Sequence, residues 1–221
     1  VNPAREMSDN PYFKKPPVQH FKAIRQQDVP RLIAQLSVRG EEQKLTLQVI
    51  CGLLVAVYTG LRDTSIRGAQ WKEIDLDSKV WTVPGARMKS RRDHQVPLPK
   101  QILDVLEELK PLSYRDSDSF VFASRSKQGY LSENTFRVAL HRLGHKVTVH
   151  GMRNLITDVL NEGEWNPDWI EKQLDHQEKN QVRAAYLRTK FLPQREQMMQ
   201  WFADWCSGEK IAATVVPFRS N

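Results

Sequence analysis

The stretch from His150 to Tyr186 constrains the fold of this chain more than any other part of the sequence. At its start, apolar residues recur at the spacing of one face of a helix: Met152, Leu155, Ile156, Val159 and Leu160. His150 and Arg153 are three residues apart, so they would share a face of the same helix. The pattern predicts an amphipathic helix that buries one side and presents an imidazole and a guanidinium together on another.

Two further reactive side chains follow this helix. His176 ends the sequence Leu174-Asp175-His176, and Tyr186 comes ten residues later. Arginine binds phosphate oxygens through two parallel hydrogen bonds, and histidine exchanges protons near neutral pH. A tyrosine hydroxyl can act as a nucleophile. These residue types together indicate chemistry at a phosphate group.

Four short boxes, in this order and at this spacing, resemble the tyrosine recombinase (phage integrase) family. They are Thr59-Gly60-Leu61-Arg62, Arg87-Met88-Lys89, His150-x-x-Arg153 and Leu174-x-His176, with Tyr186 after the last. The resemblance covers residues from about 28 to 205 and is closest to integrases of prophages and genomic (pathogenicity) islands. It implies the catalytic domain fold of that family, which is mainly α-helical with one small antiparallel β-sheet.

The resemblance also implies a role for each matching residue. Tyr186 would attack a DNA phosphodiester and become joined to the 3′ phosphate, and Lys89 would protonate the leaving 5′ oxygen. Arg62 and Arg153 would bind the non-bridging oxygens of the phosphate. His150 and His176 would assist by hydrogen bonding and proton transfer. The implied reaction is site-specific recombination that integrates or excises a mobile element, without a metal or a nucleotide cofactor.

One position departs from the family pattern. Members often carry a glutamate three residues after the first arginine, where this chain has Ser65. That glutamate is thought to orient the arginine. Asp63, one residue after Arg62, is the candidate substitute.

Composition agrees with a globular protein that meets a polyanion. The chain has 221 residues, of which 40% are hydrophobic, and a formal net charge of +7. Its two cysteines predict no disulfide framework, which indicates a reducing cytoplasm, here the bacterial nucleoid. The apolar run from Leu45 to Tyr58 is too short to span a membrane and predicts a buried helix instead. His150 and His176 lack the Cys or carboxylate spacing of a zinc site, so we expect no metal centre.

We expect three parts along the chain. Residues 1–27 contain four prolines and read as a linker from DNA-binding domains that precede the catalytic one in such proteins. Residues 28–206 would form the catalytic domain. Residues 207–221 would form a tail whose apolar, β-prone segment from Ile211 to Val216 is exchanged between protomers in the assembled complex.

Periodicity and capping residues place the elements of the catalytic domain. Asp28, Asp63 or Thr64, Ser132 and Asn166 are the expected N-caps, and Gly60 is the expected C-terminal stop of the central helix. Two or three antiparallel strands are expected between Ile74 and Leu98. Helices are expected at 28–36, 43–58, 99–109, 132–143, 150–160, 167–174 and 193–205. A further helix is expected after Asp63 or Thr64, carrying Ile66, Ala69 and Trp71.

Basic side chains outside the boxes are candidates for contact with the DNA backbone. Three lie at the tip of the predicted hairpin and two on the predicted 132–143 helix: Arg87, Arg91, Arg92, Arg137 and Arg142. His94 follows the hairpin tip, and we expect it to fix the hairpin or contact backbone instead of taking part in the chemistry.

The expected partners are double-stranded DNA attachment sites, further copies of the protein in a tetramer, and accessory DNA-bending or directionality factors. No membrane is expected. Two other functions fit the sequence. One is DNA relaxation by a type IB topoisomerase, which shares the chemistry but lacks site specificity. The other is a DNA-binding module that has no activity on its own.

Overall fold

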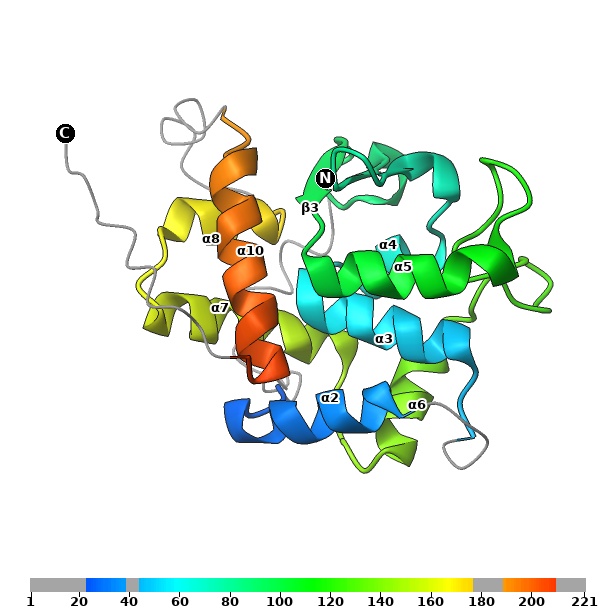
Figure 1. The fold of residues 1–221 in the computed structure, drawn as a ribbon, viewed down its shortest axis with the longest axis horizontal. Coiled ribbons are helices and arrows are strands. Elements are labelled where there is room, and N and C mark those ends of the chain that lie inside the picture. Colours follow the sequence, from blue (N-terminus) through cyan, green and yellow to red (C-terminus); the bar gives the residue numbers. More distant parts are fainter. Residues whose placement is uncertain (1–22, 39–43, 177–188, 210–221) are drawn as a thin grey trace, which may run out of the picture.

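The computed structural model describes residues 23–38, 44–176 and 189–209. Within these ranges the chain is mainly helical with one small sheet, as the sequence predicts (Figure 1). The longer elements, in chain order, are α2 (Val29–Ser37), α3 (Leu47–Thr59), α4 (Asp63–Arg67), β1 (Ile74–Asp75), β2 (Val80–Val83), β3 (His94–Pro97), α5 (Lys100–Ser113), α6 (Thr135–Arg142), α7 (Val149–Glu162), α8 (Pro167–Gln173) and α10 (Leu192–Ser207).

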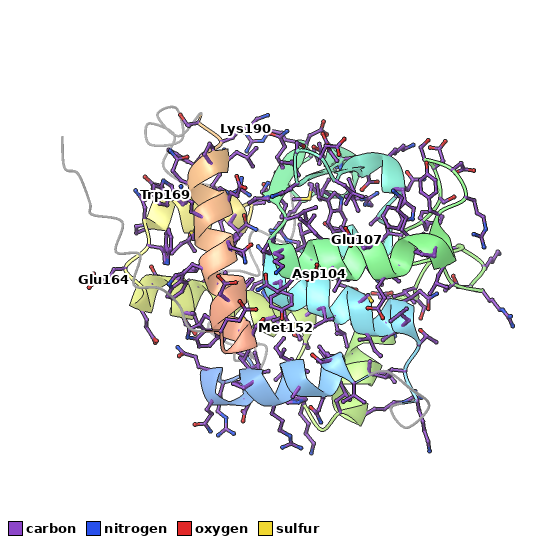
Figure 2. All side chains as sticks on the ribbon, in the orientation of Figure 1. Asp104, Glu107, Met152, Glu164, Trp169 and Lys190 are labelled. Atoms are coloured by element: carbon purple, nitrogen blue, oxygen red, sulfur yellow. The ribbon has the colours of Figure 1, made fainter. Side chains whose placement is uncertain are left out.

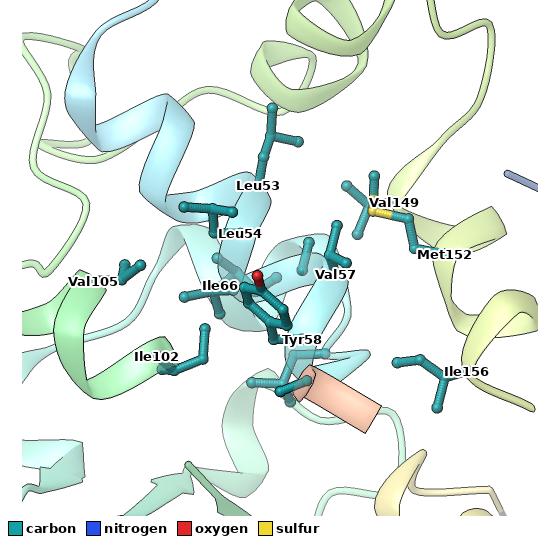
Figure 3. Close-up of a cluster of buried hydrophobic side chains, with 14 of the residues drawn as sticks. Leu53, Leu54, Val57, Tyr58, Ile66, Ile102, Val105, Val149, Met152 and Ile156 are labelled. Carbon is teal, nitrogen blue, oxygen red and sulfur yellow. The ribbon is translucent and has the colours of Figure 1, made fainter. Parts of the chain in front are cut away.

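Helix α3 is the centre of the domain. Every residue from Val49 to Thr59 is buried, because α2, α5, α6, α7 and α10 all pack around this helix. Figure 3 shows side chains of α3 between those of α5 and α7, with Tyr58 among them. The prediction of a buried helix from the apolar run is confirmed, although the described helix begins at Leu47 and residues 39–43 lie outside the described ranges.

The chain leaves α3 through Gly60, as predicted. Gly60 has φ of +66°, the left-handed conformation that glycine adopts without strain. A β-carbon at this position would lie 2.6 Å from Cδ1 of Ile156 and 2.9 Å from Cδ2 of Leu174. Gly60 is therefore required both by the turn and by the close approach of α7 and α8.

The three strands form one antiparallel sheet in the order β1-β2-β3. Trp81 pairs with Ile74 on one side and with Val96 on the other, and its indole is fully buried. The loop from Gly85 to Asp93 joins β2 to β3 and contains Lys89. The predicted sheet is thus confirmed, and its hairpin carries the basic tip.

Several predicted caps are wrong. Asp28 occupies the N-cap position of α2, but its carboxylate accepts two hydrogen bonds from Arg25 instead of capping the helix. The N-cap of α6 is Asn134, and the hydroxyl of Ser132 pairs with that of Thr135. Asn166 does cap α8, by accepting from the amide of Asp168.

The helix after Gly60 is shorter than predicted. Its N-cap is Arg62, not Asp63 or Thr64, and it ends at Arg67. Trp71 lies in a separate 3-10 turn, η3 (Trp71–Glu73). Two other helices are longer than predicted, because α5 continues to Ser113 and α10 runs from Leu192 to Ser207.

Helices α7, α8 and α10 form the second half of the domain. All five apolar residues of the predicted α7 stripe are buried, which confirms that prediction. Trp165 joins the three helices, with ring centroids 6.2 Å from Trp169 and 5.9 Å from Trp201. At the other end of the domain Ile24 is already buried in the core, so ordered packing begins before residue 28.

Candidate active site

Arg153 projects into the protein from α7. Only 4% of the residue is exposed, and its two terminal nitrogens donate hydrogen bonds to the backbone carbonyls of Gly60 and Leu174. The sequence predicted Arg153 on the same face as His150, away from the buried side. That expectation is wrong, because the turns after α3 and α8 supply two carbonyl acceptors that draw the guanidinium inward.

Burial and the neighbouring charge of Arg62 lower the pKa of Arg153 to about 10. The side chain therefore remains a cation at neutral pH, although no carboxylate bonds to it among the described residues. A buried guanidinium held by neutral acceptors keeps much of its charge available to an incoming anion.

Arg62 lies at the start of α4 and pairs with an acid on a different element. Its Nη1 is 3.3 Å from Oδ2 of Asp175, in the turn after α8. Asp63, the candidate substitute for the missing glutamate, instead pairs with Arg67 at 2.9 Å, so that expectation is wrong. Ser65 is fully buried, and its hydroxyl contacts the sulfur of Met88 at 3.5 Å.

His150 is the second residue of α7 and is exposed. Partial burial lowers its pKa, and the neighbouring charges of Arg153, Arg62 and His176 lower it further. The imidazole is therefore biased toward its neutral form, which can accept a proton. Direct contacts bring the boxes that contain these residues together, since Arg153 donates to carbonyls in the turns after α3 and α8 and Arg62 pairs with Asp175 of the Leu-Asp-His box.

His176 follows α8 and is exposed. Its Nδ1 lies 2.9 Å from Oε2 of Glu171, one turn earlier. Because a carboxylate only accepts hydrogen bonds, Nδ1 carries the proton in this pair. The contact fixes the orientation of the ring at the end of the helix. Tyr186, the predicted nucleophile, lies outside the described residues.

The hairpin tip divides into two kinds of side chain. Lys89, Arg91 and Arg92 are exposed on the loop. Arg87 is instead held by Glu73, with Nη1 2.7 Å from Oε1 and Nη2 bonded to Oε2. On α6, Arg137 and Arg142 are exposed, and the guanidinium of Arg137 also bonds to the side chain of Asn134.

A buried arginine that the sequence reading missed joins the elements around this site. Arg195 of α10 is 1% exposed, and its guanidinium donates to the side-chain oxygen of Gln173, the carbonyl of Gln95 and the carbonyl of Lys190. Gln173 in turn donates to the carbonyl of Thr59. No motif marks Arg195, and only its place in the apolar pattern of α10 hints that it is buried.

Two contacts attach the sheet to the same network. Nε2 of the buried His94 lies 3.0 Å from the carbonyl of Gln173, which confirms that His94 contacts backbone. Nζ of Lys190 donates to the side chain of Gln95, and Figure 2 labels Lys190 beside the start of α10. Strand β3, α8 and α10 are therefore held together at Gln173, immediately before the residue whose carbonyl accepts from Arg153.

Within the described part of the chain, no group of three or more His, Cys, Asp or Glu side chains is arranged to hold a metal ion. None of the described helices is long and apolar enough to cross a membrane. Both cysteines, Cys51 and Cys206, are buried free thiols, and burial raises the pKa of Cys206.

Known proteins with similar sequences or folds are integrases and recombinases. The chain is 37% identical over 195 residues to the prophage integrase IntA of Escherichia coli K12, covering 87% of this chain and 46% of that protein. It is 33% identical over 222 residues to the integrase of Enterobacteria phage P4, covering 92% and 49%. The chain thus spans about half the length of the curated relatives it matches.

Two solved structures share the fold. The integrase from mycobacterium phage Brujita superposes with a TM-score of 0.67 at 19% identity, covering 90% of this chain and 63% of that one. The Tn1549 transposon integrase, solved with a circular-intermediate DNA, gives a TM-score of 0.61 at 14% identity, covering 84% and 70%. The family model for the phage integrase family matches residues 22–192. The chain therefore belongs to the phage integrase family, the tyrosine recombinases.

Proposed function

We propose that this chain is the catalytic part of a site-specific DNA recombinase that integrates or excises a mobile element. The observation that carries the proposal is that three of the boxes contact one another. Arg153 donates to the carbonyls of Gly60 and Leu174, and Arg62 pairs with Asp175. The candidate residues of these boxes come from the start of α4, from α7 and from the turn after α8: Arg62, His150, Arg153 and His176. The names of the two relatives described above, both integrases, support the same function.

In the proposed reaction, the hydroxyl oxygen of Tyr186 attacks the scissile phosphorus while the bond to the 5′ oxygen breaks. The tyrosine hydroxyl gives its proton to the neutral imidazole of His150, and Lys89 supplies a proton to the 5′ oxygen. Arg62 and Arg153 bind the non-bridging oxygens, whose charge grows in the pentavalent transition state. His150 and His176 donate hydrogen bonds or transfer protons beside them.

The product keeps the energy of the phosphodiester in the tyrosyl linkage. A 5′ hydroxyl from a second DNA can therefore attack the linkage and rejoin the strands without ATP. We further propose double-stranded attachment sites as the substrate and a tetramer on DNA as the active assembly. The DNA-bound structures of the Tn1549 integrase support the DNA part of this proposal.

The exposed cations are proposed to bind the DNA backbone. On the hairpin these are Arg91 and Arg92, and on α6 they are Arg137 and Arg142. We also keep Arg87 as a candidate for phosphate contact, although its ion pair with Glu73 competes for the same nitrogens.

A trapping experiment tests the proposal. The full-length protein is mixed with a nicked duplex made from the junction sequence of the element and its host, so that the cleaved strand diffuses away. A covalent protein–DNA complex should form and should be absent in Tyr186→Phe, which removes one oxygen and little packing. Complex formation that persists in this variant would show that another residue is the nucleophile.

A further inference from the structure

The loop that carries Lys89 is anchored by the two residues that precede it. Arg87 forms a bidentate ion pair with Glu73, whose side chain is 3% exposed. Met88 is 5% exposed and accepts a hydrogen bond from the buried hydroxyl of Ser65. Lys89 itself is exposed. Glu73 and Met88 are buried and the Arg87 side chain is 22% exposed, so buried partners hold the backbone immediately before the exposed lysine.

The Glu73 carboxylate is built into the sheet. Its Oε2 also accepts a hydrogen bond of 3.1 Å from the indole of Trp81, which is fully buried in β2. A carboxylate that receives three donors in a buried site is held in one orientation. Glu73 therefore gives Arg87 an acceptor of fixed orientation, and the ion pair holds the loop at Arg87 in place.

The same anchors join the loop to α4. The side chain of Arg87 passes over Gly68, where an added β-carbon would be 3.2 Å from Cδ of Arg87. Ser65 and Gly68 belong to α4 and its C-cap, and Arg62 is the N-cap of that helix. The loop is also closed on itself, because a β-carbon on Gly85 would be 2.8 Å from the carbonyl oxygen of Arg91. The backbone at Lys89 thus has a fixed place relative to Arg62.

We propose that Glu73 and Arg87 are positioning residues, which hold Lys89 at a set distance from the arginine clamp so that it can reach the leaving oxygen. The inference rests on the proposed function of Lys89. It also gives Ser65 a role: the small hydroxyl that replaces the family glutamate leaves room for Met88 and holds its sulfur.

Two substrates separate positioning from general stability. One is the nicked duplex described above, and the other is the same duplex with sulfur in place of the bridging 5′ oxygen. A thiolate leaves without a proton, so the sulfur duplex does not need Lys89. In the full-length protein, Glu73→Gln keeps the shape of the side chain and removes its charge.

We expect Glu73→Gln to cleave ordinary DNA about 10-fold to 100-fold more slowly, a part of what a general acid contributes. On the sulfur duplex Glu73→Gln should cleave at the wild-type rate. Asp118→Asn is the matched control, because it breaks the exposed Lys72–Asp118 pair at 2.6 Å on the same 3-10 turn. This control should match wild type on both substrates.

A second measurement needs no DNA. Amide hydrogen exchange of residues 85–92 should be faster in Glu73→Gln than in wild type or Asp118→Asn. Suppose that Lys89→Ala regains the wild-type cleavage rate on the sulfur duplex. The positioning role is then overturned if Glu73→Gln has equal defects on both duplexes, or if it cleaves ordinary DNA at the wild-type rate. If Lys89→Ala itself is not rescued, the proposed function of Lys89 fails, and the inference fails with it.

Discussion

Asp175 pairs with Arg62 at 3.3 Å and thereby joins the turn after α8 to the start of α4. The side chains are 14% and 24% exposed, so the pair is only partly screened by water. Asp175 belongs to the Leu-Asp-His box, and it supplies the acidic partner that the sequence sought in Asp63. The pair orients the guanidinium of Arg62 before DNA binds.

Asp175→Asn should therefore lower cleavage by about 10-fold, equivalent to about 1.4 kcal/mol of transition-state stabilisation. The neutral amide keeps the shape but does not hold the guanidinium as strongly. Cleavage rates on the nicked duplex measure the effect. Asp63→Asn is the matched control, since its carboxylate pairs with Arg67, and a larger defect in this control would contradict the assignment.

Arg153→Lys should lower cleavage by at least about 100-fold, because an ammonium does not reproduce two planar donors aimed at separate acceptors. Gly60 and Leu174 would compete with the phosphate for a single charged group. Circular dichroism and thermal melting should show a folded protein, and DNA affinity should fall less than the cleavage rate. Near wild-type cleavage would mean that Arg153 supports the turns and takes no part in binding phosphate.

Arg195→Met should reduce the free energy of unfolding by about 2 to 4 kcal/mol, because it removes both arginine donors from the buried side-chain oxygen of Gln173. Urea denaturation measures the change. Arg137→Met removes an exposed guanidinium from α6 and should change stability by no more than about 0.5 kcal/mol. Similar effects of the two substitutions would show that the Arg195 network contributes nothing specific.

Stability should fall in mild acid because of His94. Burial, with the charge of Arg195, lowers its pKa from 6.5 to about 4, while Asp175 acts in the opposite direction. The unfolded chain therefore binds a proton between these two pH values and the folded protein does not. The stability from this site is full above about pH 6.5 and decreases by up to roughly 3 kcal/mol as the pH falls to 4.

Denaturation curves at pH 7 and pH 5 check this expectation. His94→Gln keeps a hydrogen-bond donor and does not titrate, so the loss of stability between the two pH values should be smaller than in wild type. An unchanged pH dependence in His94→Gln would assign the acid sensitivity to other groups.

Deleting residues 208–221 should spare folding and cleavage at a single site but impair assembly of the recombining complex. The apolar run Ile211 to Val216, which lies outside the described residues, is expected to pack on a neighbouring protomer. Recombination and native gel assays on the full-length and shortened proteins compare the two activities. Equal assembly would remove this role from the tail.

Local patterns predicted the elements well and the interior of the site poorly. Apolar spacing located α3 and the buried face of α7, and alternation located the sheet, because each signal lies within a few neighbouring residues. The burial of Arg153 depends on two backbone carbonyls far away in the chain, and such acceptors leave no mark in a sequence.

The ion pairs show the same limit. Asp63 is next to Arg62 in the sequence and so is its predicted partner, whereas Asp175, 113 residues away, reaches Arg62 through the fold. Glu73 and Arg87 are separated by 14 residues and meet only because the sheet turns between them. The predicted hairpin allows Glu73 and Arg87 to meet, but the run of basic residues at its tip indicates that Arg87 faces the solvent.

Both acceptors of Arg153 are main-chain oxygens, so they are present whatever side chains occupy the two positions. At Leu174 another apolar residue would supply the same carbonyl. At Gly60 the carbonyl points correctly only while the backbone keeps φ at +66°, and any β-carbon meets Ile156 and Leu174. Sequence divergence can therefore replace most side chains around the guanidinium while its geometry is inherited, provided that this one glycine is retained.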